Sequence, residues 1–494
     1  MSGIEGFLIP FLNPEMILYI AVGVFVGIYV GAIPGLSVTM AVSVLISFTF
    51  GWKILPALAV MVGIYVGGVY GGSRSSILLN IPGAPAAIAT TFDGFPMAQK
   101  GEAGIAMGLS TIQSVIGTLF GILVLALASP LVSNLALKFM PQDYLLISIM
   151  GLLLIGSLSK GSIIKALTTA CLGILVGMIG IDPITGQARF TFGYDKLLGG
   201  INFVAAMIGV FGLSEALMQL RDKVEPVKQK VDKIIPSWNL ILKHLPLTLR
   251  ASILGTIIGA LPGTGGDIAS LIAYDQAKRT VKNPTRPFGE GAHEGVIAPE
   301  AAKNAAIGGA FIPMMTLGIP GDSVTAVLIS AMIIHGLRPG PMLMKDQPQF
   351  FWVILGCLVI SNLFLIIFGM TGIKLFTKIV EIPKAIVIPI IIVLSIVGSY
   401  SINNSVVDIY WMIAFGILGY FFKIYNYPTA PMVLGMILSP IIDINYRRAM
   451  ALNHNNFYEL INSLLGSPIS FTLIFLIMLM PLSKLKFWKR IKMF

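Results

Sequence analysis

Residues 31–35 read Gly31-Ala32-Ile33-Pro34-Gly35, and this stretch decides the fold because it returns 228 residues later as Gly259-Ala260-Leu261-Pro262-Gly263. A second phrase, Ile81-Pro82-Gly83, follows the first copy and returns as Ile319-Pro320-Gly321 after the second. Proline removes a backbone donor and glycine loosens the chain, so we expect each phrase to interrupt a helix. Every copy lies inside or beside an apolar stretch long enough to enter a membrane. A duplicated, interrupted hydrophobic segment is typical of the binding site of a transporter.

The composition of the chain indicates a membrane protein. Of 494 residues, 56% are hydrophobic and 11% are charged, whereas about 25% of residues are charged in ordinary soluble domains. We therefore predict an all-α polytopic membrane protein with about 10 to 14 transmembrane helices, some of them re-entrant hairpins or broken helices. The N-terminus has no basic residue before its first span, so we expect that helix to be retained, with its start on the outer side.

The net charge of +11 is explained by membrane topology. Basic residues gather at 221–243, 278–286 and 484–492, beside hydrophobic spans, as they do in loops on the cytoplasmic side. Basic residues do not alternate with aromatic ones, so a nucleic-acid surface is not indicated. Cys171 and Cys357 both lie in apolar segments, which supports neither a disulfide framework nor a cysteine metal site.

The repeated phrases divide the chain into two membrane repeats. We expect the first repeat at 1–220, with Pro-Gly hairpins at 31–37 and 80–85. A basic cytoplasmic linker at 221–246 precedes the second repeat at 247–445, with hairpins at 259–267 and 318–325. Residues 446–494 form a C-terminal span and a basic tail. The loop after the hairpin at 259–267 is basic whereas its counterpart holds only Lys53, and this opposite bias favours inverted repeats.

The first repeat offers neutral hydrogen-bonding groups and one arginine. The candidate substrate ligands there are Ser73, Arg74, Ser75, Asn80, Pro82 and Gly83. An arginine within an apolar segment needs a partner, and its planar fork fits a carboxylate. The alternative is an arginine that snorkels to the membrane interface or pairs with a structural acid.

The second repeat offers oxygen ligands around its two breaks. The candidate substrate residues are Pro320, Gly321 and Ser323, and the candidate ligands of a coupling ion are Gly263, Thr264, Gly265, Asp267, Asp322 and Thr325. Exposed carbonyls with carboxylate and hydroxyl oxygens resemble the sites that hold Na⁺, and a half-helix N-terminus favours an anionic substrate. Either aspartate could take up H⁺ instead, or could simply cap a helix. Helix breaks or hinges are expected at Pro34, Gly35 and Pro262.

Other chemistries find no support in the residues. The sequence lacks a Gly-x-x-x-x-Gly-Lys-Ser/Thr loop, so nucleotide-driven transport by this chain is excluded. Gly72-Ser73 has no Gly-x-Ser-x-Gly setting, and the histidine and glutamates at 290–300 match no zinc motif. We expect no enzyme activity, no catalytic residues, no cofactor and no metal beyond a coupling Na⁺ (or H⁺ as the alternative ion).

Several ordered motifs resemble the large membrane subunit of the tripartite tricarboxylate transporter family (TctA-type). They run from about residue 15 to about residue 445 and comprise Gly67-Gly68-Val69-Tyr70-Gly71-Gly72-Ser73, Asn80-Ile81-Pro82-Gly83, Asp93-Gly94-Phe95-Pro96-Met97-Ala98, Gly259-Ala260-Leu261-Pro262-Gly263, the run 288–296, Ala298-Pro299-Glu300-Ala301-Ala302, Thr316-Leu317-Gly318-Ile319-Pro320-Gly321 and the run 335–341. The resemblance implies carboxylate uptake across a bacterial-type inner membrane. It also implies a small membrane subunit and an extracytoplasmic solute-binding protein as partners, and an elevator-like motion.

The expected function is that of a secondary active transporter subunit. It would import di- or tricarboxylates (citrate-like) with an ion gradient, with the substrate delivered by the extracytoplasmic binding protein. The alternative is an ion or solute channel, or a scaffold subunit, without coupled transport. A channel would conduct without its binding protein and without saturation at low substrate concentration.

Overall fold

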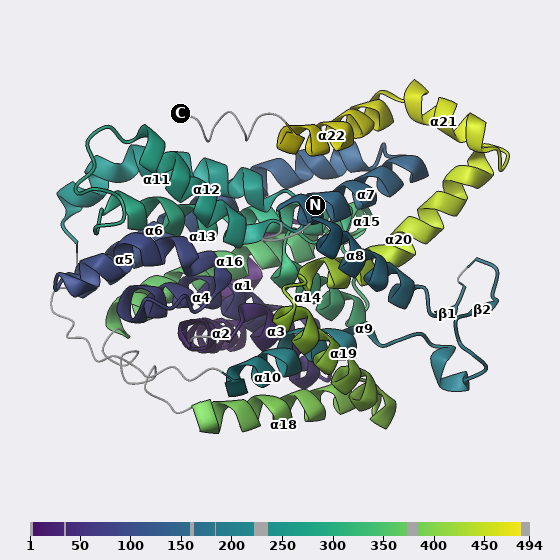
Figure 1. The fold of residues 1–494 in the computed structure, drawn as a ribbon, viewed down its shortest axis with the longest axis horizontal. Coiled ribbons are helices and arrows are strands. Elements are labelled where there is room, and N and C mark those ends of the chain that lie inside the picture. Colours follow the sequence, from purple (N-terminus) through teal and green to yellow (C-terminus); the bar gives the residue numbers. More distant parts are fainter. Residues whose placement is uncertain are drawn as a thin grey trace. The chain divides into compact units, whose positions relative to one another are not determined.

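The computed structural model describes residues 3–33, 36–158, 163–182, 184–221, 236–372 and 384–485, and almost all of its regular structure is helical (Figure 1). The chain divides into two compact units. The first comprises Met1–Leu131 and Val204–Tyr420, and the second comprises Val132–Phe203 and Phe421–Phe494. All four Pro-Gly phrases belong to the first unit. The predicted repeats divide the chain by sequence into 1–220 and 247–445, whereas each compact unit contains parts of both halves. The repeat boundaries stay a prediction.

The first unit consists of helices from both halves of the chain. Its earlier elements are η1 (Ile4–Leu8), α1 (Ile9–Leu12), α2 (Pro14–Ala32), α3 (Val38–Thr49), α4 (Ile54–Leu79), η2 (Pro85–Ala87), α5 (Ile88–Gln99) and α6 (Ala103–Ala136), which runs past the boundary. Its later elements are α9 (Phe203–Met207), the π-helical η4 (Ile208–Leu213), α10 (Ser214–Arg221), α11 (Trp238–Gly259), α12 (Gly265–Thr280), α13 (Glu294–Leu317), α14 (Ser323–Ile334), α15 (Pro341–Asp346), α16 (Pro348–Thr371), α18 (Lys384–Asn403) and α19 (Val406–Ile424).

The second unit contains the small sheet of the protein. Its elements are α7 (Pro141–Leu158), α8 (Ile163–Gly177), β1 (Gly180–Ile181), β2 (Ala188–Arg189), η3 (Asp195–Leu197), α20 (Ala430–Leu452), α21 (Phe457–Gly466) and α22 (Pro468–Leu485). The two strands pair antiparallel, with Gly180 opposite Arg189. Asp182, the first residue of the turn between the strands, contacts both Arg189 and Arg447. Hydrogen bonds from the backbone, first from the Ile184 amide, lower the pKa of Asp182 to about 2, so this network is charged near neutral pH.

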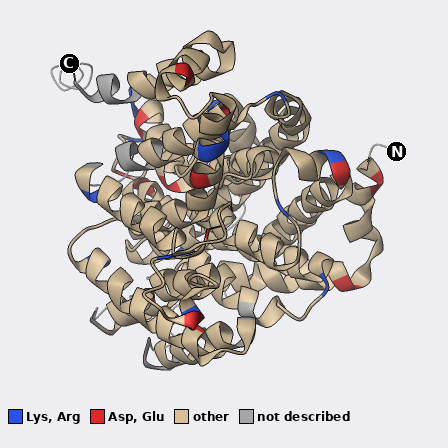
Figure 2. Cartoon of the chain, turned by 90° about the vertical axis from the view of Figure 1, so that its right-hand side faces the viewer, with Lys and Arg blue, Asp and Glu red and all other residues tan. Residues whose placement is uncertain are grey.

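Helices long and apolar enough to cross a membrane confirm the polytopic class. Among the described residues there are six such helices, or up to seven if the bent pair α21–α22 counts as one span. This number is smaller than the predicted one because several apolar helices, such as α14, have only 10–17 residues. Helix α13 has 24 residues but contains Glu300 and Lys303. Charged residues are sparse on the ribbon (Figure 2).

The four repeated phrases lie between helices. Helix α2 ends at Ala32 and α3 begins at Val38, while Pro34 and Gly35 between them are outside the described residues. Helix α11 ends at Gly259, and α12 begins at Gly265. Helices α4 and α13, which precede the two Ile-Pro-Gly phrases, end in the same way. Their C-terminal caps, Asn80 and Gly318, both adopt left-handed backbone, with φ of 58° and 72°.

The two halves of the first unit repeat the same close helix contacts. Glycines let the backbones of α2 and α4 meet in the first half, and those of α11 and α13 in the second. The matched pairs are Gly27–Ile64, Gly31–Gly68 and Gly71–Ile28 in the first half, and Gly255–Ala302, Gly259–Ala306 and Gly309–Thr256 in the second. Positions 27 and 255 differ by 228 and positions 64 and 302 by 238, which are the offsets of the two sequence phrases.

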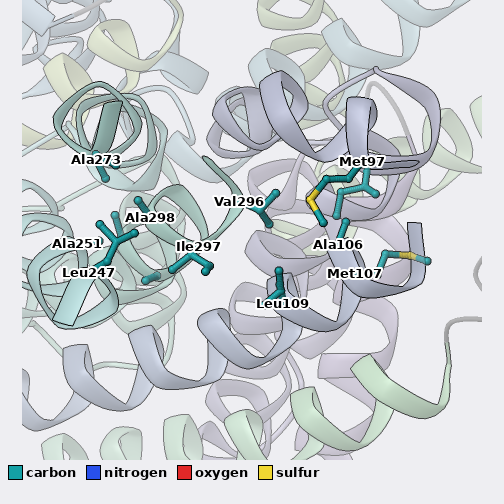
Figure 3. Close-up of a cluster of buried hydrophobic side chains, with 14 of the residues drawn as sticks. Met97, Ala106, Met107, Leu109, Leu247, Ala251, Ala273, Val296, Ile297 and Ala298 are labelled. Carbon is teal, nitrogen blue, oxygen red and sulfur yellow. The ribbon is translucent and has the colours of Figure 1, made fainter. Parts of the chain in front are cut away.

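A shared apolar core holds the halves together. Its buried residues come from α4, α5 and α6 of the first half and from α11, α12 and α13 of the second. Figure 3 shows Met97 and Val296 on facing elements, with Leu109 and Ile297 nearby. Burying this surface from both halves in one cluster makes the first unit a single body rather than two independent repeats.

The loop before α13 is fixed to the first half by two carboxylates. Asp93 in α5 is fully buried, and its Oδ1 accepts hydrogen bonds from the amides of Gly289, Gly291 and Ala292 at 2.8–2.9 Å. Beside it, both oxygens of Glu102 accept bonds of 2.6 Å from the Arg286 guanidinium. These bonds fix the start of α13 against the first half.

We predict that Gly67→Ala destabilises the protein. A Cβ atom at Gly67 would clash with the backbone of Val24 in α2, although alanine is otherwise the better helix former. Overpacking of this kind costs about 1–3 kcal/mol, so the thermal midpoint in detergent should fall by several degrees. Gly51→Ala is the matched control, because a Cβ there meets nothing within 4 Å. Equal midpoints for the two variants would contradict the packing described here.

We predict that Glu102→Gln frees the loop before α13 near neutral pH. The hydrogen bonds from Arg286 lower the pKa of Glu102, so the pair stabilises the fold above the ordinary glutamate pKa and stops doing so as pH falls through the lowered value. At pH 7 the amides of residues 285–292 should exchange hydrogen roughly fivefold faster in the variant. Below the lowered pKa the difference should vanish.

The control for this variant is Asp275→Asn. It breaks the Asp275–Arg279 pair on α12, whose side chains are 55% and 53% exposed, and exposed pairs of this kind contribute little. Loop exchange should therefore stay at the wild-type rate in the control. A difference between Glu102→Gln and wild type that is the same at every pH would show that the ionised pair does not hold the loop.

Candidate functional site

The candidate residues of the first half lie along the end of α4 and the turn that follows it. Ser73 and Ser75 are fully buried, whereas Asn80 is exposed and Pro82 is half-buried. Ser75 donates to the Gly72 carbonyl at 3.3 Å. Gly83 is buried, and its amide donates to the same carbonyl at 3.2 Å. The turn therefore folds back on the last part of α4.

Arg74 lies in a fully packed environment. Its guanidinium donates to the Tyr70 hydroxyl and to the Gly369 carbonyl of α16, and the side chain is 1% exposed. The guanidinium carbon is also 4.9 Å from the centre of the Tyr70 ring, which is within the range of a cation–π interaction. In this conformation Arg74 joins α4 to α16. Its predicted contact with a substrate carboxylate stays a prediction.

The first break of the second half begins α12 without a side-chain cap. Thr264 is the N-cap residue, but its hydroxyl donates to the carbonyls of Ile258 and Leu261. Gly263 is half-buried, Asp267 is exposed, and Pro262 and Gly265 are buried. The first amides of α12 are therefore not capped by Thr264, and a helix N-terminus in this state favours a negatively charged partner.

The second break of the second half begins α14 with a complete capping box. The Asp322 carboxylate accepts from the Thr325 amide at 2.7 Å, and the Thr325 hydroxyl accepts from the Asp322 amide at 2.9 Å. The buried hydroxyl of Tyr65 in α4 donates to the other oxygen of Asp322. Pro320 and Gly321 are buried, whereas Asp322 and Ser323 are half-buried. Asp322 thus joins the two halves.

The breaks of the two halves form a closed ring of neighbours. A Cβ on Gly83 would clash with the Gly31 carbonyl at the end of α2. A Cβ on Gly266 would lie 3.6 Å from Ala86 Cβ, and one on Gly265 would lie 2.7 Å from Asp322 Cβ. The Ser323 hydroxyl hydrogen-bonds to the Thr39 hydroxyl at 2.8 Å. Thr39 lies in α3, which follows the break after α2, so this bond closes the ring. We call these eight residues, Gly31, Thr39, Gly83, Ala86, Gly265, Gly266, Asp322 and Ser323, the break ring.

Three helices begin at the break ring. They are α3, α12 and α14, and they contact the ring through Thr39, Gly265 and Ser323. The N-terminal end of a helix carries a partial positive charge and amides that lack partners within the helix. Asp322 caps α14 and Ser37 caps α3, so among these three helices only α12 lacks a side-chain cap at its N-terminus. The positive ends of the three helix dipoles, with neutral hydroxyls between them, are an arrangement suited to an anion. The Asp322 carboxylate at the same place supplies hard oxygens for a small cation.

Sequence reasoning missed a densely hydrogen-bonded polar cluster in the first unit. Glu300 and Lys303 in α13 are both fully buried and pair at 3.0 Å. Four hydroxyls from α4, α5 and α6 donate to the Glu300 carboxylate. The available signal was an acid and a lysine three residues apart in an otherwise apolar helix, because intramembrane charges occur in pairs. Tyr65 and Thr39 gave no such signal.

No group of three or more histidine, cysteine, aspartate or glutamate side chains that could hold a metal ion occurs in the described part of the chain. Any ion held at the break ring would therefore rely on carbonyl and hydroxyl oxygens besides Asp322. Pro34 and Gly35, the first predicted hinge, lie outside the described residues, whereas Pro262 lies in the turn between α11 and α12.

Comparison of the sequence with known proteins identifies its family. Residues 17–434 match the family described as tripartite tricarboxylate transporter TctA family. The chain is 37% identical over 448 residues to an uncharacterized 52.8 kDa protein in the TAR-I ttuC' 3' region of Agrobacterium vitis, covering 90% of this chain and 89% of that protein. It is 41% identical over 202 residues to an uncharacterized protein in the TAR-II ttuC' 3' region of Agrobacterium vitis, covering 41% of this chain and 83% of that protein.

No solved structure matches the chain. The family match covers most of the sequence, including all four Pro-Gly phrases, and the 37% identical relative is covered almost from end to end. A multi-pass helical protein with this match is a transporter subunit. The chain therefore belongs to the tripartite tricarboxylate transporter TctA family.

Proposed function

We propose that this chain is the translocating subunit of a secondary transporter that imports di- or tricarboxylates with an ion gradient. The observation that carries the proposal is the break ring, where three helix N-termini meet hydroxyl and carboxylate oxygens from both halves. Membership of the TctA family supports a tricarboxylate-type substrate and a non-enzymatic role. The substrate would bind where both repeats contribute, as in transporters built from broken helices.

The substrate carboxylates would meet backbone amides rather than a cluster of basic side chains. The uncapped start of α12 offers amides at Gly265 and Gly266, and Ser323 offers a hydroxyl. On the first half, exposed Asn80 and half-buried Pro82 lie in the turn between α4 and η2. Amides and hydroxyls of this kind recognise a carboxylate without a buried counter-charge.

A coupling cation would bind beside Asp322. Its carboxylate, the carbonyls of the 263–265 turn and the Thr325 hydroxyl are hard oxygen ligands, which favour Na⁺ over a proton as the coupling ion. The cation would offset part of the substrate charge in an environment of low dielectric constant. Tyr65 would hold the carboxylate in place from the first half.

The partners would be those of a three-component system. A small membrane subunit would accompany this chain in the inner membrane, and an extracytoplasmic binding protein would deliver the carboxylate to the outer side. The two repeats would face opposite ways across the membrane, and an elevator-like motion of the body that contains both would expose the break ring to either side. The equivalent α2–α4 and α11–α13 contacts support the division into two structural repeats on which this motion rests.

We predict that Asp322→Asn uncouples uptake from the ion gradient. Asparagine keeps an oxygen that can accept from the Thr325 amide, so α14 should still start correctly, but the negative charge is lost. In proteoliposomes with all three components, gradient-driven uptake of labelled citrate should fall at least about tenfold. The thermal midpoint should change little.

Asp346→Asn is the control, because Asp346 is exposed at the end of α15. It should transport like the wild type. Gradient-driven uptake by Asp322→Asn at the wild-type rate would exclude Asp322 from the coupling site.

We predict that Arg74→Lys distinguishes two roles of Arg74: binding the substrate, or joining α4 to α16. Lysine keeps the charge but cannot donate to Tyr70 and the Gly369 carbonyl with the same planar fork. A substrate ligand would raise the KM for citrate roughly tenfold or more, whereas a residue that only joins α4 to α16 would lower the thermal midpoint and leave KM unchanged. The contacts of this conformation predict the second result, and a raised KM at an unchanged midpoint would contradict it.

A further inference from the structure

Glu300 lies at the centre of a polar cluster that the transport proposal does not use. Two hydroxyls donate to its Oε1, from Ser73 at 2.7 Å and from Thr90 at 2.5 Å. Two more donate to its Oε2, from Ser110 at 2.8 Å and from Ser114 at 3.1 Å. The residues come from α4, α5, α6 and α13, and all are almost fully buried. We call Glu300 and these four hydroxyl residues the oxygen cage.

The positive charge inside this cage comes from Lys303. Its ammonium lies 3.0 Å from Glu300 Oε1 and also donates to the Ser73 hydroxyl. The lysine side chain is fully buried, so its charge is matched only within the protein. The Ser73 hydroxyl donates to Glu300 while accepting from Lys303, which is the pattern of an oxygen that contacts a cation.

The ligand set is that of a site for a monovalent cation. One carboxylate and several hydroxyl oxygens are hard ligands, which hold Na⁺ or K⁺ rather than a transition metal. A full negative charge in such a buried place would be very unfavourable without a counter-ion. In this chain the counter-ion is attached covalently to the same helix, three residues away.

We propose that the oxygen cage is a monovalent-cation site whose resident cation is the Lys303 ammonium. The lysine makes the cage independent of ions in solution and keeps α13 fastened to the first half at every Na⁺ concentration. When the ammonium is removed and its space is left open, Na⁺ or K⁺ should enter the cage in its place.

The test is the thermal unfolding of the purified full chain in detergent. Lys303→Ala leaves room for an ion, whereas Lys303→Met removes the charge and fills most of the space. In choline chloride both variants should unfold roughly 5 to 10 °C below the wild type, because each removes the ammonium that pairs with buried Glu300 at 3.0 Å. Adding NaCl or KCl at constant ionic strength should restore at least about half of the loss in Lys303→Ala, with saturation, and little in Lys303→Met.

The double variant Glu300→Gln/Lys303→Ala identifies the ligand. It retains the open space and the hydroxyls but lacks the carboxylate, so its response to NaCl should equal that of the wild type. A cation bound beside Asp322 would shift the unfolding midpoint of the wild type and of every variant alike, because Asp322 is unchanged in all of them. Subtracting the response of the wild type to NaCl therefore removes this contribution. The assay measures no transport, so its result is independent of the proposed function.

Two outcomes would overturn the proposal. One is a Lys303→Ala protein that responds to Na⁺ and K⁺ no more than the wild type. The other is a Lys303→Ala protein that does not accumulate in folded form in cells, which contain both ions, while the double variant does. Either result would make the pair a structural contact that no free cation can replace.

Discussion

The structure depends on how interrupted helices satisfy their ends in apolar surroundings. A helix end leaves backbone amides and carbonyls without partners, and lipid offers none. Here the ends are gathered in one place, because the breaks of the two halves are neighbours in the break ring. Asp322 caps the start of α14 and accepts from Tyr65 of the other half, so one carboxylate both caps a helix and joins the two halves.

Glycine makes this gathering possible. The helices α2 and α4 approach so closely that a Cβ on Gly67 would clash with the Val24 backbone, and α11 and α13 meet in the same way through Gly255. Without a strong hydrophobic force between helices in lipid, such close packing is a principal source of association. The same register in both halves brings equivalent breaks to equivalent places.

Buried charges reinforce the contact between the halves. Asp93 binds three backbone amides of the loop before α13, and Glu300 binds hydroxyls from α4, α5 and α6. In each case the acid and most of its partners come from different halves. A carboxylate with this many donors is specific in geometry, so it fixes how the two halves meet as well as holding them together.

The sequence by itself determined the helical membrane class and the register of the duplication. Both follow from local properties, namely the length of apolar runs and the spacing of proline and glycine. The sequence offered a helix cap as one alternative for Asp322, and in the structure this residue forms a capping box with Thr325. Ligand roles at these positions stay predictions, because a carboxylate in sequence looks the same whether it caps a helix or holds an ion.

Only the tertiary structure decided which distant residues share a place. Tyr65 and Asp322 are 257 positions apart, and the hydroxyls around Glu300 lie 186 to 227 positions away from it. No periodicity encodes such pairings, because they arise when two halves pack and each buried polar group must find a donor or acceptor. For the same reason Arg74, which the sequence offers as a carboxylate ligand, lies in this conformation against Tyr70 and the Gly369 carbonyl.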